Sequence, residues 1–353
     1  MRDRVTRATA RLGVRHPIVQ GPFGGGLSTA ELVAVVSNMG GLGSYGAHGV
    51  APEDIGELAA EIRALTAGPF ALNLWVSDHD PGGRELSPAE FERLAQRFAP
   101  YFRELGLDPP TPPPRFHHSF ELQVEALLEA RPPVFSFVFG VPSAKILSEC
   151  KRRGIVTMGA ATSLAEARLL DEAGVDLLVA TGMEAGGHRP SFLARAEESL
   201  MSTFVLTQLV ADRVQAPVVA AGGIADRRAI RAALELGADA AQIGTAFLAC
   251  DESGASDEHR AKLFGADAEH TTLTRAFTGR LARGIRNRWT EEMKDMRDTL
   301  PPFPVQSWFV SQLKTAAVAA RRTDLVSLWA GQIAPNLRHR SATELMQSLL
   351  EET

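Results

Sequence analysis

The segment Pro217-Val218-Val219-Ala220-Ala221-Gly222-Gly223-Ile224-Ala225-Asp226 decides the fold, because it joins an apolar strand to a helix through two glycines. A short apolar run bounded by glycine is typical of a parallel strand that is covered on both faces. Further along the chain, Gln242-Ile243-Gly244-Thr245 ends a second run of the same kind. The sequence therefore predicts repeated strand-turn-helix units.

The same alternation of apolar runs and amphipathic stretches extends back towards the N-terminus. We predict strands at residues 17–20, 41–45, 70–75, 134–139, 155–159, 175–180, 217–221 and 240–243. We predict helices at residues 29–38, 52–65, 119–130, 143–153, 163–173, 199–214 and 226–236, several with a Ser, Thr or Asp cap. Eight such units favour an α/β TIM (β/α)8 barrel over an open sheet of about five or six strands.

Two long segments do not fit the regular alternation. Residues 76–118, after the third strand, are expected to be an insertion, and its prolines 109, 110, 112, 113 and 114 favour a stiff, extended conformation. Beyond Cys250 no strand pattern is visible. We therefore predict a barrel at residues 1–250 and a mainly helical extension at residues 251–353 that packs on the barrel.

Composition excludes several classes of protein. Hydrophobic residues make up 45% of the chain and charged residues 22%, which is close to the average for soluble globular proteins. The formal net charge of -5 lacks the basic excess of a protein that binds nucleic acid or an anionic membrane. Two cysteines, Cys150 and Cys250, are too few for a disulfide framework and have no metal-ligand spacing.

The N-terminus superficially resembles a transit peptide. Its arginines are Arg2, Arg4, Arg7, Arg11 and Arg15. The first strand is predicted to begin at Pro17, which leaves little to cleave, and no apolar run approaches the ~20 residues that span a bilayer. We expect a cytoplasmic protein.

The turns at Gly222-Gly223 and at Gly244 are candidates for binding a phosphate. They follow the last two strands, where TIM barrels usually bind phosphate through backbone N–H groups. Each turn alone is better explained as a simple strand-to-helix connection. Their combination favours a phosphate site.

A third glycine-rich segment, Glu184-Ala185-Gly186-Gly187-His188, follows the sixth strand. Histidine suits proton transfer near neutral pH, and glycines let the backbone approach a flat ligand. A single histidine is more often structural, but the position of His188 near the predicted phosphate site favours a catalytic role. His117 and His118 are adjacent in the insertion, which is poor geometry for a shared metal ion, and we predict no metal site.

Two further segments lie at the same end of the predicted barrel. Gln20-Gly21-Pro22-Phe23-Gly24-Gly25-Gly26 ends the first strand, and Asn73 lies near the end of the third. Pro22 and Asn73 are placed to meet the edge of a cofactor ring. A flexible turn and an Asn that bonds to local backbone groups are equally good explanations.

Taken together, these segments resemble the nitronate monooxygenases, formerly called 2-nitropropane dioxygenases, which are FMN-dependent TIM-barrel enzymes. The resemblance extends over most of the chain and depends on the order of the motifs. They are Pro17-Ile18-Val19-Gln20, Ser37-Asn38-Met39-Gly40-Gly41-Leu42-Gly43, the strand around Asn73, residues 184–188, Ala221-Gly222-Gly223-Ile224, residues 242–245, and Phe277-Thr278-Gly279-Arg280-Leu281-Ala282-Arg283 with Asn287.

The resemblance implies a cofactor, a substrate class and a set of site residues. His188 would be the catalytic base, and a nitroalkane or nitronate would react with FMN and O2 to give a carbonyl compound and nitrite. The candidate cofactor contacts are Pro22, Asn73, Thr181, Gly186, Gly187, Gly222, Gly223, Gln242, Ile243, Gly244 and Thr245. Thr181 departs from the family, where Gln is common at this position, and Pro190 stands where Gly is usual.

Other functions remain open at this point. Flavin-dependent enoyl-acyl-carrier-protein reductases share the barrel and the Gly-Gly-His loop but require NAD(P)H. IMP dehydrogenase uses a loop cysteine, and neither Cys150 nor Cys250 is placed for that role. A non-catalytic flavin-binding protein would have no need of His188. The expected partners are a small nitro compound and O2, without nucleic acid or membrane, and the sequence is compatible with a homo-oligomer.

Overall fold

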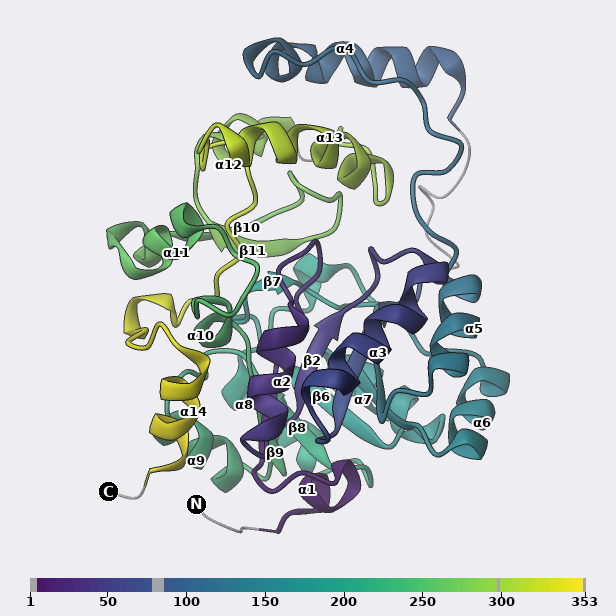
Figure 1. Ribbon diagram of the computed structural model, residues 1–353, viewed down its shortest axis with the longest axis vertical. Coiled ribbons are helices and arrows are strands. Elements are labelled where there is room, and N and C mark those ends of the chain that lie inside the picture. The colour runs from purple at the N-terminus through teal and green to yellow at the C-terminus, as the bar shows by residue number, and fades with distance from the viewer. Residues whose placement is uncertain (1–4, 78–85, 297–298, 352–353) are drawn as a thin grey trace.

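The computed structural model describes residues 5–77, 86–296 and 299–351. Eight parallel strands surround a central axis, and helices cover them (Figure 1). The strands are β1 (Ile18–Gln20), β2 (Gly43–Gly46), β3 (Phe70–Trp75), β4 (Val134–Val138), β5 (Val156–Ala161), β6 (Leu177–Thr181), β8 (Val218–Ala221) and β9 (Ala240–Ile243). Each predicted strand is present.

The sheet closes on itself. Its order is β1-β9-β8-β6-β5-β4-β3-β2, and a parallel bridge between Val19 and Leu42 joins β1 to β2. The backbone N–H of Gln20 donates to the Leu42 carbonyl at 2.9 Å across this seam. The prediction of an α/β TIM barrel is therefore confirmed.

The helices around the barrel are α2 (Ala30–Asn38), α3 (Ile55–Leu65), α5 (Phe120–Ala130), α6 (Ala144–Arg153), α7 (Leu164–Glu172), α8 (Thr203–Ala211) and α9 (Arg227–Glu235). Most begin after a Ser, Thr or Asp whose side chain accepts from a first-turn N–H, as expected for these residues. α8 begins at Thr203 rather than at the predicted residue 199, because Ser202 caps it and residues 196–201 belong to the loop before it.

The eighth helical position is filled from the far end of the chain. Only the four-residue α10 (Thr245–Leu248) follows β9, which is too short to cover the barrel there. Instead, α14 (Ala342–Leu350) packs beside α2 and α9 (Figure 1). Its buried Leu345, Met346 and Leu349 join the core formed by Leu32 and Ile230. The end of the predicted extension is thus part of the barrel wall.

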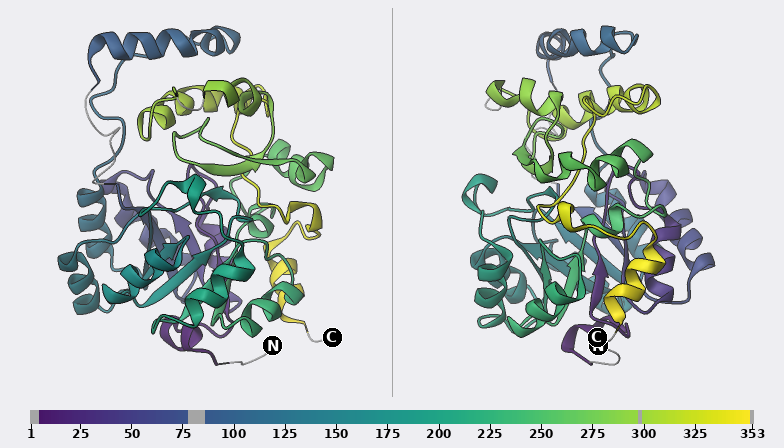
Figure 2. Two further views of the ribbon diagram at one scale, coloured as in Figure 1. Left: turned by 180° about the vertical axis from the view of Figure 1, so that it is seen from behind. Right: turned by 90° about the vertical axis from the view of Figure 1, so that its left-hand side faces the viewer.

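The bottom of the barrel is closed by α1 (Arg7–Leu12), whose Ala8 and Leu12 pack against Val19 and Leu177 inside the barrel. α1 and the last turn of α14 (Ala342–Leu350) both lie at this side (Figure 2). Arg2 and Arg4, considered above as part of a transit peptide, lie outside the described residues. No helix in the described part of the chain has both the length and the apolar character needed to cross a membrane.

The opposite end of the barrel is covered by elements that we call the cap (Figures 1 and 2). The cap consists of α4 (Pro88–Glu104), α11 (Asp257–Phe264), β10 (Thr271–Thr274), β11 (Ala282–Ile285), α12 (Arg288–Glu292) and α13 (Val305–Ala319). β10 and β11 form an antiparallel sheet with β7 (Gly187–His188) in the order β10-β11-β7. The expectation that no strand follows Cys250 was wrong for these two strands.

The insertion contributes a helix to the cap. The sequence favoured an extended segment, and indeed no helix or strand covers residues 105–119, but α4 is a 17-residue helix capped by Ser87. Its Phe98 stacks on Phe309 of α13, with ring centroids 4.9 Å apart. Residues 78–85 of the predicted insertion lie outside the described residues. Two distant chain segments therefore build one layer over the barrel.

Candidate active site

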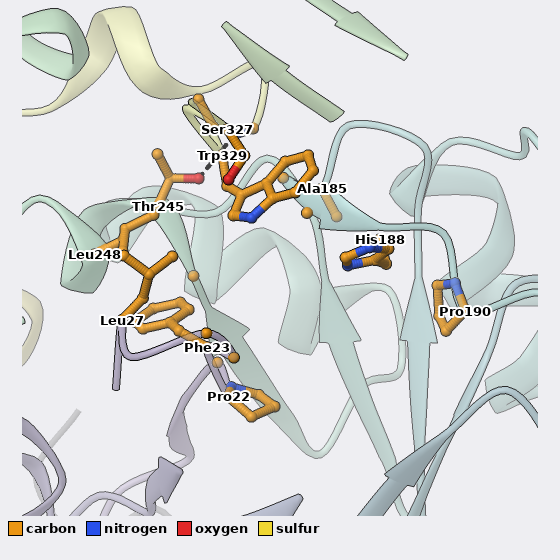
Figure 3. A pocket seen from close by; sticks show the side chains of 18 of the residues that line it. Pro22, Phe23, Leu27, Ala185, His188, Pro190, Thr245, Leu248, Ser327 and Trp329 are labelled. Atoms are coloured by element: carbon orange, nitrogen blue, oxygen red, sulfur yellow. Dashed lines mark hydrogen bonds between the residues drawn. The ribbon is translucent and has the colours of Figure 1, made fainter. Parts of the chain in front are cut away.

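A cavity of about 330 Å³ lies between the carboxyl ends of the strands and the cap. Loops after β1, β2, β3, β4, β6, β8 and β9 contribute to it, together with α13 and residues 325–331 of the extension. Figure 3 shows Pro22 and His188 from the barrel loops and Trp329 from the extension around this space. TIM-barrel enzymes have their active sites at this end.

The predicted site residues converge on this cavity with one exception. Those that line it are Pro22, Asn73, Thr181, Gly186, Gly187, His188, Gly222, Gly223, Gln242, Gly244 and Thr245. Ile243 instead lies fully buried among residues between the strands and the outer helices. Side chains alternate along a strand, so the neighbour of the cavity-lining Gln242 points to the opposite side. The backbone carbonyl of Ile243 accepts a hydrogen bond from Gly21 N–H at 2.9 Å.

The two glycine turns leave space beside the backbone. Gly222 and Gly223 have φ values of +119° and +68°, which residues with a Cβ rarely adopt. A Cβ placed on Gly223 would meet no protein atom closer than 3.7 Å, and one on Gly244 would meet none closer than 3.9 Å. No side chain caps α10 after Gly244. The turns therefore form a cradle that a ligand, rather than protein, can fill.

The glycine-rich loop after β6 is held rigidly by buried charges. Arg189, 1% exposed, donates to the carbonyls of Thr181, Gly182 and Ser199 at 3.0, 2.6 and 2.7 Å. Glu184 accepts from Thr203 N–H and Oγ1–H, each at 2.9 Å. Burial lowers the pKa of Arg189 to about 10, so the guanidinium stays charged at neutral pH. These bonds fix both ends of a loop whose glycines alone would leave it flexible.

His188 connects this loop to the cap. As part of β7 it pairs with Ala282 of β11, and its Nε2 lies 2.9 Å from Thr278 Oγ1. The Thr278 hydroxyl donates in turn to the Arg280 carbonyl at 3.3 Å. In this chain of bonds Nε2–H donates to Thr278, and the imidazole retains a lone pair on Nδ1.

The imidazole of His188 is neutral at physiological pH. Burial, with a smaller contribution from the Arg280 charge, lowers its pKa to about 3. The rings of Trp75 and Trp329 lie near it, with centroid distances of 4.7 and 5.3 Å. A neutral imidazole in an apolar setting can accept a proton, and the resulting cation is stable only beside an anion.

Several lining residues were not predicted from sequence. His48, Trp75 and Phe139 come from loops or strand ends of the barrel, whereas Lys314 and Gly331 come from the extension. Trp75 and Phe139 lie at the carboxyl ends of β3 and β4, a position that makes any large side chain a candidate. Residues of the extension gave no such indication, because their contact with the barrel depends on tertiary packing.

Asn73 and Thr181 have local partners as well as cavity contacts. Asn73 Nδ2 donates to Ser136 Oγ at 3.0 Å on the neighbouring strand, and Thr181 Oγ1–H donates to the Val179 carbonyl at 3.4 Å. Asn73 thus bonds to a side chain of the neighbouring strand rather than to local backbone groups, and it also lines the cavity. Pro190, the second departure from the family pattern, also lines the cavity.

The cysteines and the histidine pair lie outside this chemistry. Cys150 and Cys250 are buried. Burial raises the pKa of the Cys150 thiol to about 11, and it also raises the pKa of the Cys250 thiol. Thiols in this state are poor nucleophiles. His117 Nδ1 lies 2.6 Å from the His118 carbonyl. Within the described ranges, no three His, Cys, Asp or Glu side chains gather in a group that could hold a metal ion.

Comparison with known proteins gives consistent results. A family model described as "Nitronate monooxygenase" matches residues 6–352. The chain is 42% identical to a nitronate monooxygenase of Pseudomonas aeruginosa, covering 100% of this chain and 99% of that protein. It is 35% identical to a probable nitronate monooxygenase of Staphylococcus aureus, covering 98% of this chain and 96% of that protein.

Solved structures of two kinds are similar to this fold. Nitroalkane oxidase from Streptomyces ansochromogenes has a TM-score of 0.88 at 34% identity, covering 98% of this chain and 96% of that chain. FabK from Thermotoga maritima has a TM-score of 0.75 at 29% identity, covering 98% and 95% respectively. The similarity includes both the barrel and the cap, since nearly the whole chain is covered.

Proposed function

Because the chain belongs to the nitronate monooxygenase family of oxidoreductases, we propose that it uses FMN and O2 to convert alkyl nitronates and nitroalkanes into a carbonyl compound and nitrite. One observation carries the proposal. The neutral, half-buried His188 lies in the same cavity as the glycine turns at Gly223 and Gly244. A proton acceptor and a phosphate cradle in one cavity suit a cofactor enzyme that acts on a weak carbon acid.

The residues of the cavity fit FMN. The turns at Gly223 and Gly244 would hold its phosphate, since a Cβ on either glycine would meet no protein atom closer than 3.7 Å and would point into space beside the cavity. Asn73, Thr181, Gly186 and Gln242 would contact the rest of the cofactor. When bound, flavin supplies the ability to take an electron from the substrate and pass it to O2, which no side chain possesses.

His188 would serve as the base for neutral substrates. A nitroalkane must lose its α-proton before it can be oxidised, and the Nδ1 lone pair can accept that proton while Nε2–H remains bonded to Thr278. The imidazolium so formed would be stabilised by the nitronate anion beside it. A substrate that arrives as the nitronate would not need the proton transfer.

One alternative has a specific observation in its favour. The similarity to FabK extends over 98% of the chain at 29% identity, which keeps the enoyl-acyl-carrier-protein reductase function as the second candidate. The similarity to nitroalkane oxidase is greater on both TM-score and identity, and favours the nitro substrate.

Turnover of purified protein tests the proposal. The protein is expected to be yellow and to release FMN, not FAD, on denaturation. With ethyl nitronate in air it should consume O2 and form acetaldehyde and nitrite in equal amounts. If the flavin-loaded protein formed no nitrite from either ethyl nitronate or nitroethane, the proposed reaction would be overturned.

A further inference from the structure

The part of the cavity beside His188 is enclosed by aromatic rings. Trp75 lies edge-on to the imidazole at 4.7 Å between centroids, and Phe139 lies edge-on at 6.2 Å. Trp75 is the last residue of β3, and Phe139 follows the last residue of β4. We call these two side chains the aromatic wall. Any group held within reach of His188 lies close to this wall.

Trp75 has little freedom to move. The His48 ring stacks on the indole at 3.8 Å between centroids and 12° between planes, and Trp75 is 6% exposed. His48 also packs against the loop after β1, because a Cβ on Gly24 would lie 2.0 Å from His48 Cε1. The indole therefore cannot retreat towards the β2 loop without moving this whole stack.

Phe139 is fixed in a conformation that a bulky residue rarely adopts. Its φ is +70°, which costs conformational energy in a residue with a large side chain. The Arg280 guanidinium carbon lies 3.6 Å from the centre of the Phe139 ring and 4.8 Å from that of Phe303. Phe139 meets Trp75 edge-on at 4.9 Å. Each member of the wall is thus supported by the other and by a planar group beside it.

We propose that Trp75 limits the size of the group attached to the nitro-bearing carbon, so that the enzyme accepts compact alkyl nitronates and discriminates against bulky ones. This inference rests on the proposed function, which places that carbon at His188. A packed interior resists added volume, and a wall supported on several sides cannot shift to admit it. Trp75 is a specificity-determining residue in this account.

Shortening the Trp75 side chain tests the inference through substrate preference. In Trp75→Ala, the ratio of kcat/KM for cyclohexyl nitronate to kcat/KM for ethyl nitronate should rise at least about tenfold, the scale on which apolar pockets discriminate size. Trp75→Phe should give an intermediate rise. Because this variant retains an aromatic ring, it keeps the test available if Trp75→Ala does not fold. The matched control is Trp308→Phe, because Trp308 packs against Phe91, Phe116 and Phe309 within the cap.

Binding of unreactive carboxylates gives a second readout without turnover. A carboxylate has the planar, anionic shape of a nitronate group but is not oxidised. Calorimetry should show that cyclohexanecarboxylate gains at least about tenfold in affinity relative to propionate in Trp75→Ala, with no gain in Trp308→Phe. An unchanged ratio in the folded Trp75 variants would overturn the inference. If the unmodified protein oxidises no nitronate, the proposed reaction fails. The carboxylate affinity ratios would still show whether Trp75 limits the size of a bound group.

Discussion

At the scale of single residues, the proposed chemistry depends on one imidazole kept neutral by its surroundings. His188 is enclosed by aromatic rings and bonded through Nε2 to Thr278, and burial lowers its pKa to about 3. A histidine in water, with its ordinary pKa of about 6.5, would be partly protonated at neutral pH. Removing the imidazole from water thus reserves its lone pair for the substrate.

Replacing this imidazole should separate the two kinds of substrate. His188→Asn is expected to lower kcat/KM for nitroethane by about 10²- to 10⁴-fold, because only the neutral substrate needs a base. Turnover of preformed ethyl nitronate should fall much less. His270→Asn is the control, since His270 is exposed next to β10. Equal losses on both substrates, with flavin still bound, would show that His188 acts through positioning alone.

The cradle at Gly223 gives a second prediction at this scale. Gly223→Leu should yield folded protein that has lost its flavin colour, because the side chain would occupy the space next to the turn. Gly154→Leu is a matched control, since Gly154 has a similar φ of +72° at the end of α6 and a Cβ placed on it would meet no atom within 4 Å. Flavin content is measured by absorbance after gel filtration. Full retention of flavin by Gly223→Leu would refute the assignment.

Sequence reasoning found the site residues that lie in local motifs. Gly186, His188 and Gly223 lie in the segments that follow β6 and β8, so their place at the carboxyl end of the barrel could be predicted from the strand pattern. Lys314 and Trp329 could not, because nothing near them in the chain indicates that the cap brings them to the cavity. The prediction for Ile243 was wrong as to its side chain, because the alternation along β9 turns that side chain into the core.

At the scale of elements, α4 is expected to hold the cap together. Its Phe98 is fully buried against Trp289 and Phe309. Phe98→Ala should destabilise this layer by about 3–5 kcal/mol, the usual cost of removing a buried phenyl ring. Hydrogen exchange should accelerate in α4 and α13 and change little in α3. Phe204→Ala, at a position 63% exposed, should leave all three rates unchanged.

A different outcome would change the account of the cap. If exchange in α4 and α13 were the same in Phe98→Ala as in the unmodified protein, the ring would not be the main link between the insertion and the extension. Phe91 against Phe309, Tyr101 against Trp289, and the ion pairs of Glu104 with Arg288 and Arg322 would then be the other links. These ion pairs are partly exposed, and such pairs usually contribute little.

The elements that the sequence missed share a physical cause. The strands β10 and β11 are short, with sequences Thr-Thr-Leu-Thr and Ala-Arg-Gly-Ile. They pair with each other, and β11 also pairs with β7, which lies far away in the sequence. Periodicity over a few residues carries little information, so tertiary pairing decides their conformation. Most barrel strands, by contrast, are buried on both sides and show short apolar runs, as in β3 and β8. Their positions could therefore be predicted closely.

At the scale of the whole molecule, buried histidines make stability depend on pH. Burial lowers the pKa of His188 to about 3, that of His117 and His259 to about 4, and that of His48 well below its usual value. These groups bind protons in the unfolded chain from about pH 6.5 downwards but not in the folded protein. The contribution of these histidines to the free energy of unfolding is fully present above pH 6.5, and it is lost as the pH falls towards 4.

The size of the effect can be measured by urea unfolding. Between pH 7 and pH 5, each of His117, His188 and His259 should cost roughly 2 kcal/mol of unfolding free energy, because the pH then lies about 1.5 units below the unfolded pKa. His259→Gln should remove the contribution of one histidine, so the loss of unfolding free energy between pH 7 and pH 5 should be smaller by roughly 2 kcal/mol. An unfolding free energy that is the same at pH 7 and pH 5 would show that these side chains are not buried in the neutral form.

The central claim is that the whole assembly of barrel, cap and cavity takes electrons from a nitronate. The most direct test is the absorbance of the protein-bound flavin after anaerobic mixing with ethyl nitronate, nitroethane, NADH or NADPH in a stopped-flow instrument. The account predicts fast bleaching by ethyl nitronate, slower bleaching by nitroethane that requires His188, and little change with NADH or NADPH. Fast bleaching by NADH or NADPH, with no response to ethyl nitronate, would contradict it and favour an enoyl reductase.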